Sequence, residues 1–237
     1  MKLLKNWDNK NWLSSSLYIN SFISFLLKKK KLNKHSNILD IGCGRGKIIG
    51  FLSRKFKLIN NPIGIDIVTH KDRDKSINFK NQNIFKFFEN NKIKFDLIII
   101  KQTIHFFNKT ERNRLIELCK KNLKKNGKLV ILTLNTINNE IPCFKLMKIK
   151  LLKGLEKDSV MIKNICKILN KYEIDNFKFN VSVTRKKYIQ MLEQRYISCL
   201  INLTKKEIYK GIEEIKKSFP KKIFFTDVLI SLTYHKK

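Results

Sequence analysis

The sequence predicts an α/β fold, a doubly wound and mostly parallel sheet of seven strands whose last strand is antiparallel. Three observations carry this prediction. Short apolar segments alternate with amphipathic helical segments along residues 37–134. Residues 95–100 and 128–134 are almost unbroken apolar runs, typical of parallel strands buried on both faces. A glycine-rich turn directly follows the first apolar segment, and such sheets bind ligands at the ends of their first strands.

The first half of the chain is expected to build most of this sheet. An amphipathic pattern over residues 12–32 predicts an N-terminal helix. The remaining segments of this half are expected as strands at 37–41, 62–68, 78–79, 95–100 and 128–134, helices at 47–57, 84–90 and 109–123, and a turn at 124–127. Each helix can serve as the crossover that a parallel strand pair requires.

The second half has a different pattern. Thr204 and Glu207 resemble a capping box at a break near residues 203–205. The expected segments are helices at 141–171 and 186–219, an exposed edge strand at 177–184 and a final strand at 223–234. The last two strands lie too far apart in sequence for a hairpin, so a helical insertion is expected between them.

Lysine gives the chain a formal net charge of +32. A basic balance can mean a nucleic-acid or membrane partner, because Lys and Arg neutralise phosphates. The chain also contains no alanine, few glycines and many Lys, Asn, Ile and Phe residues, which suggests an AT-rich genome that fills exposed positions with lysine. The positive residues are overwhelmingly Lys rather than the Arg that bidentate phosphate recognition favours. Both interpretations stay open.

The cysteines and the apolar stretches bear on metal binding, membrane association and the cellular compartment. The five cysteines are widely spaced and form no CxxC or Cys/His pattern, so neither a zinc site nor a disulfide framework is expected. The apolar stretch at residues 17–27 is interrupted by polar residues and too short to span a bilayer. We therefore expect no metal, no membrane partner and a cytoplasmic location.

The string LDIGCGRGK at residues 39–47 is the main candidate ligand site. Gly42 and Gly44 would let the backbone turn tightly and approach a ligand, and the helix after Gly46 would direct its N-terminal amides at the site. The spacing is GxGxG, whereas the dinucleotide fingerprint is GxGxxG. Asp40 suits a nearby cation such as an ammonium group, and would be badly placed beside a pyrophosphate. The alternative is that Asp40 only caps a helix or a turn and binds no ligand.

The string closely resembles motif I of the class I S-adenosylmethionine-dependent methyltransferases, and the resemblance covers about residues 36–135. Gly64-Ile65-Asp66 falls where the family's ribose-binding acid ends the second strand, although Asp66 could be a simple turn residue. Asn83 stands where the family often has an Asp that contacts adenine. Phe95-Asp96-Leu97-Ile98 resembles the entry to the fourth strand, and residues 123–132 resemble the turn into the fifth. The cofactor-binding residues implied are Asp40, Gly42, Cys43, Gly44, Gly46, Asp66, Ile67, Asn83, Ile84 and Lys101, with Cys43 a small loop filler rather than a nucleophile.

Residues after the fourth strand and in the insertion are weaker candidates. His105 could be a general base or could only shape the pocket, and Gln102 could line the substrate. Arg195 could receive an acidic substrate group, with Tyr196 beside it, or could be a surface arginine that covers the core with its stem.

The resemblance implies an enzyme that transfers a methyl group from S-adenosylmethionine by in-line displacement. The pattern is nearest to the small-molecule methyltransferases of types 11 and 25, so a small-molecule acceptor is expected. The alternatives are methylation of ribosomal or transfer RNA through the basic surface, a cofactor-binding protein without catalysis, and a nicotinamide oxidoreductase. We expect one domain over residues 1–237, comprising an N-terminal helix (1–35), a cofactor-binding core (36–135) and a helical lid with the closing strands (136–237).

Overall fold

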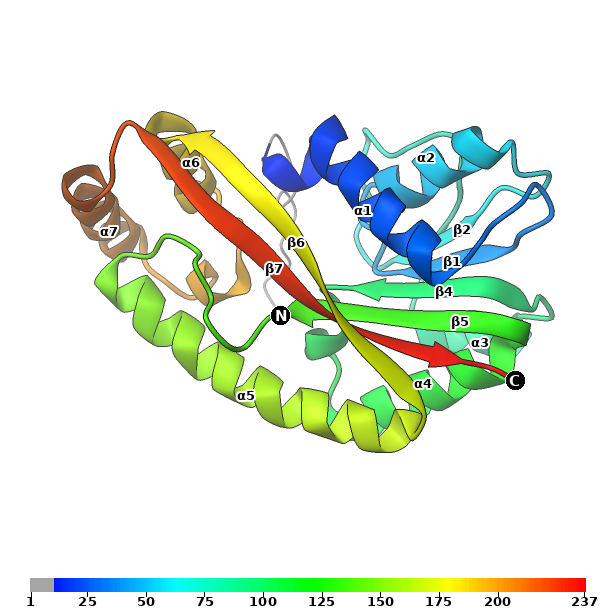
Figure 1. The fold of residues 1–237 in the computed structure, drawn as a ribbon. Coiled ribbons are helices and arrows are strands. Elements are labelled where there is room, and N and C mark those ends of the chain that lie inside the picture. Colours follow the sequence, from blue (N-terminus) through cyan, green and yellow to red (C-terminus); the bar gives the residue numbers. More distant parts are fainter. Residues whose placement is uncertain (1–10) are drawn as a thin grey trace. The chain divides into compact units, whose positions relative to one another are not determined.

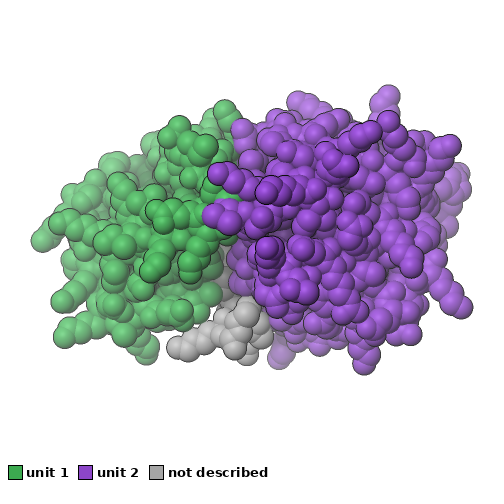
Figure 2. Space-filling view, turned by 90° about the horizontal axis from the view of Figure 1, so that it is seen from below, with its two compact units in different colours: residues 1–18, 135–159, 178–228 green, residues 19–134, 160–177, 229–237 purple. Residues whose placement is uncertain are grey.

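A computed structural model describes residues 11–237; residues 1–10, which belong to the predicted N-terminal segment, lie outside the described part. The chain forms two compact units, coloured separately in Figure 2. Unit 1 contains residues 1–18, 135–159 and 178–228, and unit 2 contains residues 19–134, 160–177 and 229–237. Unit 2 thus holds nearly all of the predicted cofactor-binding core. The expectation of a single domain stays a prediction.

The strands of the described residues form one seven-stranded sheet in the order β3-β2-β1-β4-β5-β7-β6 (Figure 1). The pairs among β1 to β5 are parallel, and β7 runs antiparallel to β5, as predicted. The strands are β1 (Ile38–Ile41), β2 (Ile63–Asp66), β3 (Asn78–Asn81), β4 (Phe95–Lys101), β5 (Leu123–Leu134), β6 (Tyr172–Thr184) and β7 (Lys222–His235). The reversal of strand order beside β1 creates the switch point at which such sheets bind ligands.

Helices connect the strands much as the periodicity predicts. The helices are η1 (Trp12–Ser14), α1 (Ser16–Lys29), α2 (Lys47–Phe56), α3 (Ile84–Asn90), η2 (Ile104–Phe106), α4 (Lys109–Asn122), α5 (Lys145–Leu169), α6 (Arg185–Glu193), η3 (Ser198–Leu200) and α7 (Lys205–Ser218). Thr204 and Glu207 form the predicted capping box of α7. The last helices, α6 to α7, lie between β6 and β7 in the chain, so the predicted helical insertion is confirmed.

Several predicted boundaries differ from the structure. The helix expected at 186–219 is interrupted well before the predicted break near 203–205, because α6 ends at Glu193 and α7 begins at Lys205, with η3 between them. The turn expected at residues 124–127 belongs to β5, which begins at Leu123 because that residue pairs with Phe95 before the register shifts. The edge strand begins at Tyr172, five residues before the predicted start. The helix expected from residue 141 begins at Lys145, since residues 141–144 are irregular. The N-terminal helix ends at Lys29, three residues early.

The two faces of the unit 2 sheet differ in polarity. One face packs a large apolar cluster that includes Leu39, Ile98 and Ile131 against α3, α4 and the last turns of α5. The register places Asp40 opposite Ile99 and Lys101 opposite Leu132 on the other face, where Ser231 and Thr233 also lie. These four polar residues are buried. Asp40, Lys101, Ser231 and Thr233 thus share one face, whereas the buried Thr133 lies on the face of the apolar cluster.

Candidate cofactor site

The glycine loop after β1 is held in a conformation that only glycine adopts easily. Gly42, Gly44 and Gly46 all have positive φ angles, of 75°, 55° and 68°. The Gly42 and Cys43 amides both donate to the Ile65 carbonyl at the end of β2, over 2.8 and 3.1 Å. A side chain at Gly42 would place its Cβ 2.1 Å from Thr103 Oγ1. The loop therefore keeps a bare backbone surface between the ends of β1 and β4.

Gly46 is the N-cap of α2 and has no side chain to cap the helix. Its Cβ would lie 2.2 Å from Ile77 Cδ1, so this position also has no room for a side chain. The free amides at the start of α2 favour a negatively charged ligand group. This is the arrangement that the GxGxG spacing predicts.

Asp66, at the carboxyl end of β2, is tied to the same loop. Its Oδ2 accepts a hydrogen bond from the Gly44 amide, and its Oδ1 accepts one from the Val68 amide, both over 2.8 Å. A carboxylate has about four acceptor positions, so each oxygen can still accept another hydrogen bond. Asp66 can thus fix the loop and bind a pair of hydroxyl groups at the same time.

Asp40 is the buried acid of the site, with 4% of its surface exposed. Burial raises the pKa of Asp40 to about 7; the Lys101 ammonium opposes this rise and the Asp66 carboxylate adds to it. Lys101 is also buried, donates to Gln102 Oε1 over 3.2 Å and lies 5.6 Å from the centre of the Phe22 ring. A cation that approached Asp40 would lower its pKa and keep it ionised.

The segment after β4 turns sharply beneath the loop. Gln102 has a φ of 53°, and its amide donates to the Leu132 carbonyl. His105 follows in η2, and its Nε2 is buried with no hydrogen-bond partner. Burial lowers the pKa of His105 to about 4, so the imidazole is neutral at physiological pH. A neutral, unpaired nitrogen can accept a hydrogen bond or a proton from a ligand.

Asn83 and the residues near it lie where β2 and β3 end. Asn83 caps α3, and its Oδ1 accepts from the Phe85 amide over 2.8 Å, which leaves its amide nitrogen as a donor. Ile84 is buried in the core, whereas Ile67 is 58% exposed directly after β2. An exposed apolar side chain beside Asp66 is suited to contact a flat ring.

Three residues that shape the glycine loop were not predicted from the sequence. Thr103 fills the space behind Gly42, and Ile77 fills the space behind Gly46. The buried Arg45 of the loop directs its Nε at both carboxylate oxygens of Asp72, each 2.8 Å away. A buried arginine inside a glycine loop could have suggested a fixing acid nearby, but the sequence does not reveal which one.

The two substrate candidates of the insertion belong to unit 1. Arg195 has a φ of 52°, and its Nη2 donates to the Leu203 carbonyl over 2.8 Å. Its Nε is buried and unpaired. Tyr196 is buried, and its hydroxyl lies 2.9 Å from that of Tyr188. These contacts hold the insertion together, and the substrate role of both residues stays a prediction.

The described residues offer neither a metal site nor a membrane-spanning helix. Within residues 11–237, His, Cys, Asp and Glu side chains do not gather in groups of three that could hold a metal ion. No helix in that range has the length and apolarity needed to cross a membrane. All five cysteines are free thiols.

Comparison with known proteins agrees with this geometry. Residues 15–154, more than half of the chain, match a family described as "Methyltransferase domain". No curated protein sequence matches the chain.

Three solved structures share the fold. The plantazolicin methyltransferase BpumL, solved with a monoazolic desmethylPZN analog and SAH, has a TM-score of 0.56 at 16% identity over 98% of this chain and 88% of its own. A structure described as a methyltransferase from an antibiotic biosynthesis pathway of Anabaena variabilis has a TM-score of 0.60 at 15% identity over 89% and 95%. The precorrin-6y C5,15-methyltransferase of Geobacter metallireducens has a TM-score of 0.53 at 12% identity over 96% and 92%. The family match together with this shared fold shows that the chain belongs to the methyltransferase-domain family of class I, S-adenosylmethionine-dependent enzymes.

Proposed function

We propose that this protein transfers a methyl group from S-adenosylmethionine to a small-molecule acceptor, with the cofactor held at the carboxyl ends of β1, β2 and β4. The observation that carries the proposal is the glycine loop with its positive φ angles and no space for a Cβ at Gly42. Such a bare backbone surface, backed by Thr103, is suited to a ligand that packs directly against the main chain.

The charged residues fit the cofactor's chemical groups. Asp40 is a buried carboxylate whose pKa is raised to about 7, because the Lys101 ammonium offsets only part of the effect of burial. The α-ammonium of a methionyl group would bring a further positive charge next to it. Asp66 retains acceptor capacity for the two ribose hydroxyls. Asn83 retains a donor for the adenine ring, and Ile67 offers an apolar surface.

The bound cofactor would supply an electrophilic methyl group on a sulfonium, whose departure as a neutral thioether needs no help from the protein. The residues of this chain would therefore bind, align and exclude water. His105 Nε2, neutral and unpaired, would accept the acceptor's proton or a hydrogen bond from it. Gln102 and Lys101 precede His105 at the end of β4 and in the turn that follows, and Lys101 Nζ donates to Gln102 Oε1.

A small acceptor is supported by the structurally similar enzymes named above, which are described as acting in plantazolicin, antibiotic and precorrin chemistry. The helical insertion of α6, η3 and α7 belongs to unit 1, and the substrate role of its Arg195 and Tyr196 stays a prediction.

The test is isothermal titration of the protein with S-adenosylmethionine and with S-adenosylhomocysteine. We expect binding in the micromolar range, about −8 kcal/mol, for the wild type. Asp66→Ala should weaken it at least about tenfold, because two hydroxyl contacts and the loop tether are lost. Glu89→Ala removes an exposed carboxylate in the same unit and should leave the affinity for both compounds unchanged. Folded wild-type protein that binds neither compound would overturn the proposal.

A further inference from the structure

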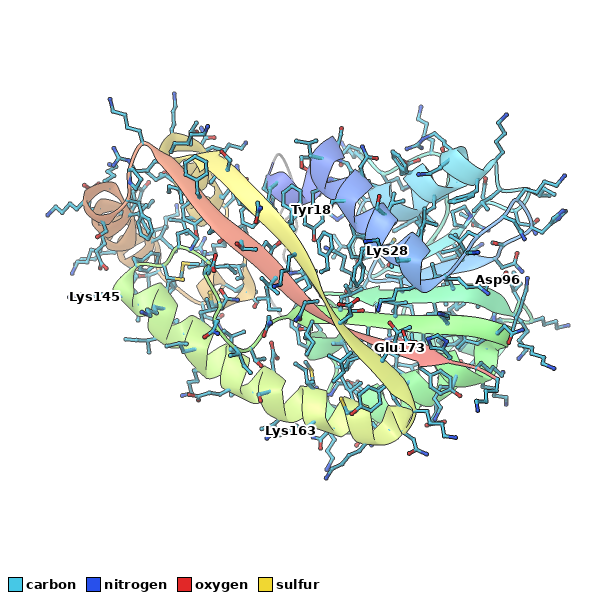
Figure 3. The ribbon with its side chains drawn as sticks, in the orientation of Figure 1. Tyr18, Lys28, Asp96, Lys145, Lys163 and Glu173 are labelled. Atoms are coloured by element: carbon cyan, nitrogen blue, oxygen red, sulfur yellow. The ribbon has the colours of Figure 1, made fainter. Side chains whose placement is uncertain are left out.

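A cluster of lysines lies at the amino ends of β4 and β5, where α4 leads into β5. Its members come from four separate segments of unit 2: Lys30, Lys94, Lys121, Lys124 and Lys236. In Figure 3, Asp96 marks this end of β4, away from the arrowhead. Figure 1 shows the C-terminal end of the chain at the same place, and the Lys236 carbonyl and amide pair with Asn126 and Gly127.

The backbone of this turn holds the ammonium groups in place. Lys94 Nζ and Lys236 Nζ both donate to the Lys121 carbonyl, over 3.1 and 3.2 Å. Lys236 Nζ also donates to the Leu123 carbonyl over 2.8 Å, and Lys30 Nζ donates to the Asn126 carbonyl over 2.9 Å. Two ammonium groups on one carbonyl oxygen are necessarily close together. The side chains are thus ordered before any partner arrives.

Carboxylates do not balance this charge. Lys124 pairs with Asp96 over 2.7 Å, whereas Lys30, Lys94 and Lys236 form no ion pair with the carboxylates of residues 11–237. At the neighbouring Lys128, burial lowers the pKa and Glu173 opposes this shift, while the charges of Lys30 and Lys29 add smaller effects that lower the pKa further. Positive charges that repel each other at fixed positions are stabilised by an anion that binds several at once.

The cluster is separate from the cofactor site. The candidate cofactor residues lie at the carboxyl ends of parallel strands, and the lysines lie at the amino ends. β4 has seven residues, so about 20 Å of strand separates the two edges. An anion bound at the lysines is therefore a docking partner and does not present its acceptor atom to the cofactor through this contact.

The chemistry of the cluster favours phosphates spaced along a chain. Lysine binds phosphate as a point charge, whereas the planar fork of arginine suits carboxylates, and no arginine belongs to the cluster. A lipid surface usually also receives apolar side chains. Among residues 11–237, Ile93 is the one large exposed apolar residue that directly neighbours a cluster lysine, Lys94, in the sequence. We propose that this lysine cluster docks the protein on the phosphate backbone of a nucleic acid, without reading its bases.

The experiment compares two triple variants that lose the same charge. The first combines Lys94→Gln, Lys121→Gln and Lys236→Gln. The control combines Lys163→Gln, Lys167→Gln and Lys171→Gln, three exposed lysines at the end of α5 and just beyond it in the same unit. Binding of a fluorescein-labelled single-stranded RNA is followed by anisotropy between about 50 and 200 mM salt.

We expect the cluster variant to bind about tenfold more weakly at the low-salt end. The slope of log affinity against log salt should fall by about 2, since each phosphate contact on a single strand contributes about 0.7. The control should stay within about twofold of the wild type. A third variant with arginine at the three cluster positions should keep the wild-type slope, which shows that charge rather than a folding defect is responsible.

Three outcomes would overturn the proposal. Equal losses in both glutamine variants would mean that total charge, not the cluster, attracts the RNA. Absence of RNA binding by the wild type would remove the partner. Tighter, cluster-dependent binding to vesicles of phosphatidylcholine and phosphatidylglycerol than to RNA would assign the surface to a membrane. None of these readouts requires methyl transfer, so the result is independent of the proposed function.

Discussion

Buried polar groups are handled differently in the two units. In unit 1 they pair with one another: Trp12 Nε1 donates to Asp227 over 3.0 Å, and the Tyr188 hydroxyl contacts both the Pro142 carbonyl and Tyr196. At the strand ends of unit 2, Asp40 has a strongly raised pKa and His105 Nε2 has no partner. Paired groups specify a fold, and incompletely paired groups indicate where a ligand completes the site. Arg195 Nε is the exception within unit 1.

The largest effect should come from filling the bare loop. Gly42→Ala puts a side chain at a φ of 75°, which costs about 1–2 kcal/mol, and against Thr103. The loop must shift, so we expect cofactor affinity to fall at least about 100-fold. Gly154→Ala is the matched control, because nothing lies within 4 Å of its Cβ in α5. It should raise the free energy of unfolding by about 0.5–1 kcal/mol. Unchanged binding by Gly42→Ala would remove the loop from the site.

Asp40 should make the wild type less stable as the pH rises. Its folded pKa of about 7 lies above the ordinary 3.8, so the unfolded chain releases this proton first. The wild type therefore loses up to about 1.4 kcal/mol of unfolding free energy per pH unit between about pH 4 and pH 7. The amide of Asp40→Asn does not titrate. The free energy of unfolding of this variant relative to the wild type should therefore rise between about pH 4 and pH 7 and then stay constant. Urea unfolding at several pH values measures it. A constant difference would show that Asp40 is compensated in the folded protein.

Tyr188→Phe tests the paired cluster of unit 1. The substitution leaves the Pro142 carbonyl and the Tyr196 hydroxyl without this partner in a buried place, at a cost of about 2 kcal/mol. Cofactor affinity should not change. Tyr209→Phe, at a tyrosine that is 60% exposed, should alter the unfolding free energy by less than about 0.5 kcal/mol. A loss of cofactor affinity without loss of stability in Tyr188→Phe would reverse the assignment of the two regions.

The order of strands and helices along the chain and the position of the glycine loop could be predicted from the sequence because both depend on local patterns. Apolar runs mark buried parallel strands, and glycine spacing marks positive φ angles. The pattern fails at the edge: residues 172–176 of β6 are all exposed, so no alternation distinguishes them from a loop. It also fails at residues 124–127, whose Lys-Lys-Asn-Gly sequence is typical of turns. There Asn126 and Gly127 form backbone hydrogen bonds with Lys236, and Leu123 before them pairs with Phe95 of β4.

Only some of the residues of the candidate site could be predicted from the sequence. Asp40 and the glycines follow from one motif and Asp66 from the family resemblance at the end of the second strand, and the structure brings them together. Thr103 and Ile77, which fill the space behind the glycines, come from distant segments whose contacts no spacing predicts. Whether a polar group is paired depends on the whole fold. For this reason His105 could be proposed from sequence, but its unpaired nitrogen could not.

Among the substitutions of buried side chains, the smallest effect on stability at neutral pH should come from His105→Phe. Its Nε2 has no hydrogen bond to lose, so we expect a change below about 1 kcal/mol. Burial lowers the pKa of His105 from 6.5 to about 4, so the wild type loses stability as the pH falls through this range, and the variant should gain on it there. This dependence is opposite in direction to that of Asp40. If His105 serves the acceptor, methyl transfer should fall by about 100-fold or more while cofactor affinity stays constant. If the rate of methyl transfer and the cofactor affinity both stay constant, the imidazole only fills space. The ligand site of unit 2 is then marked by Asp40 and its neighbours, without His105.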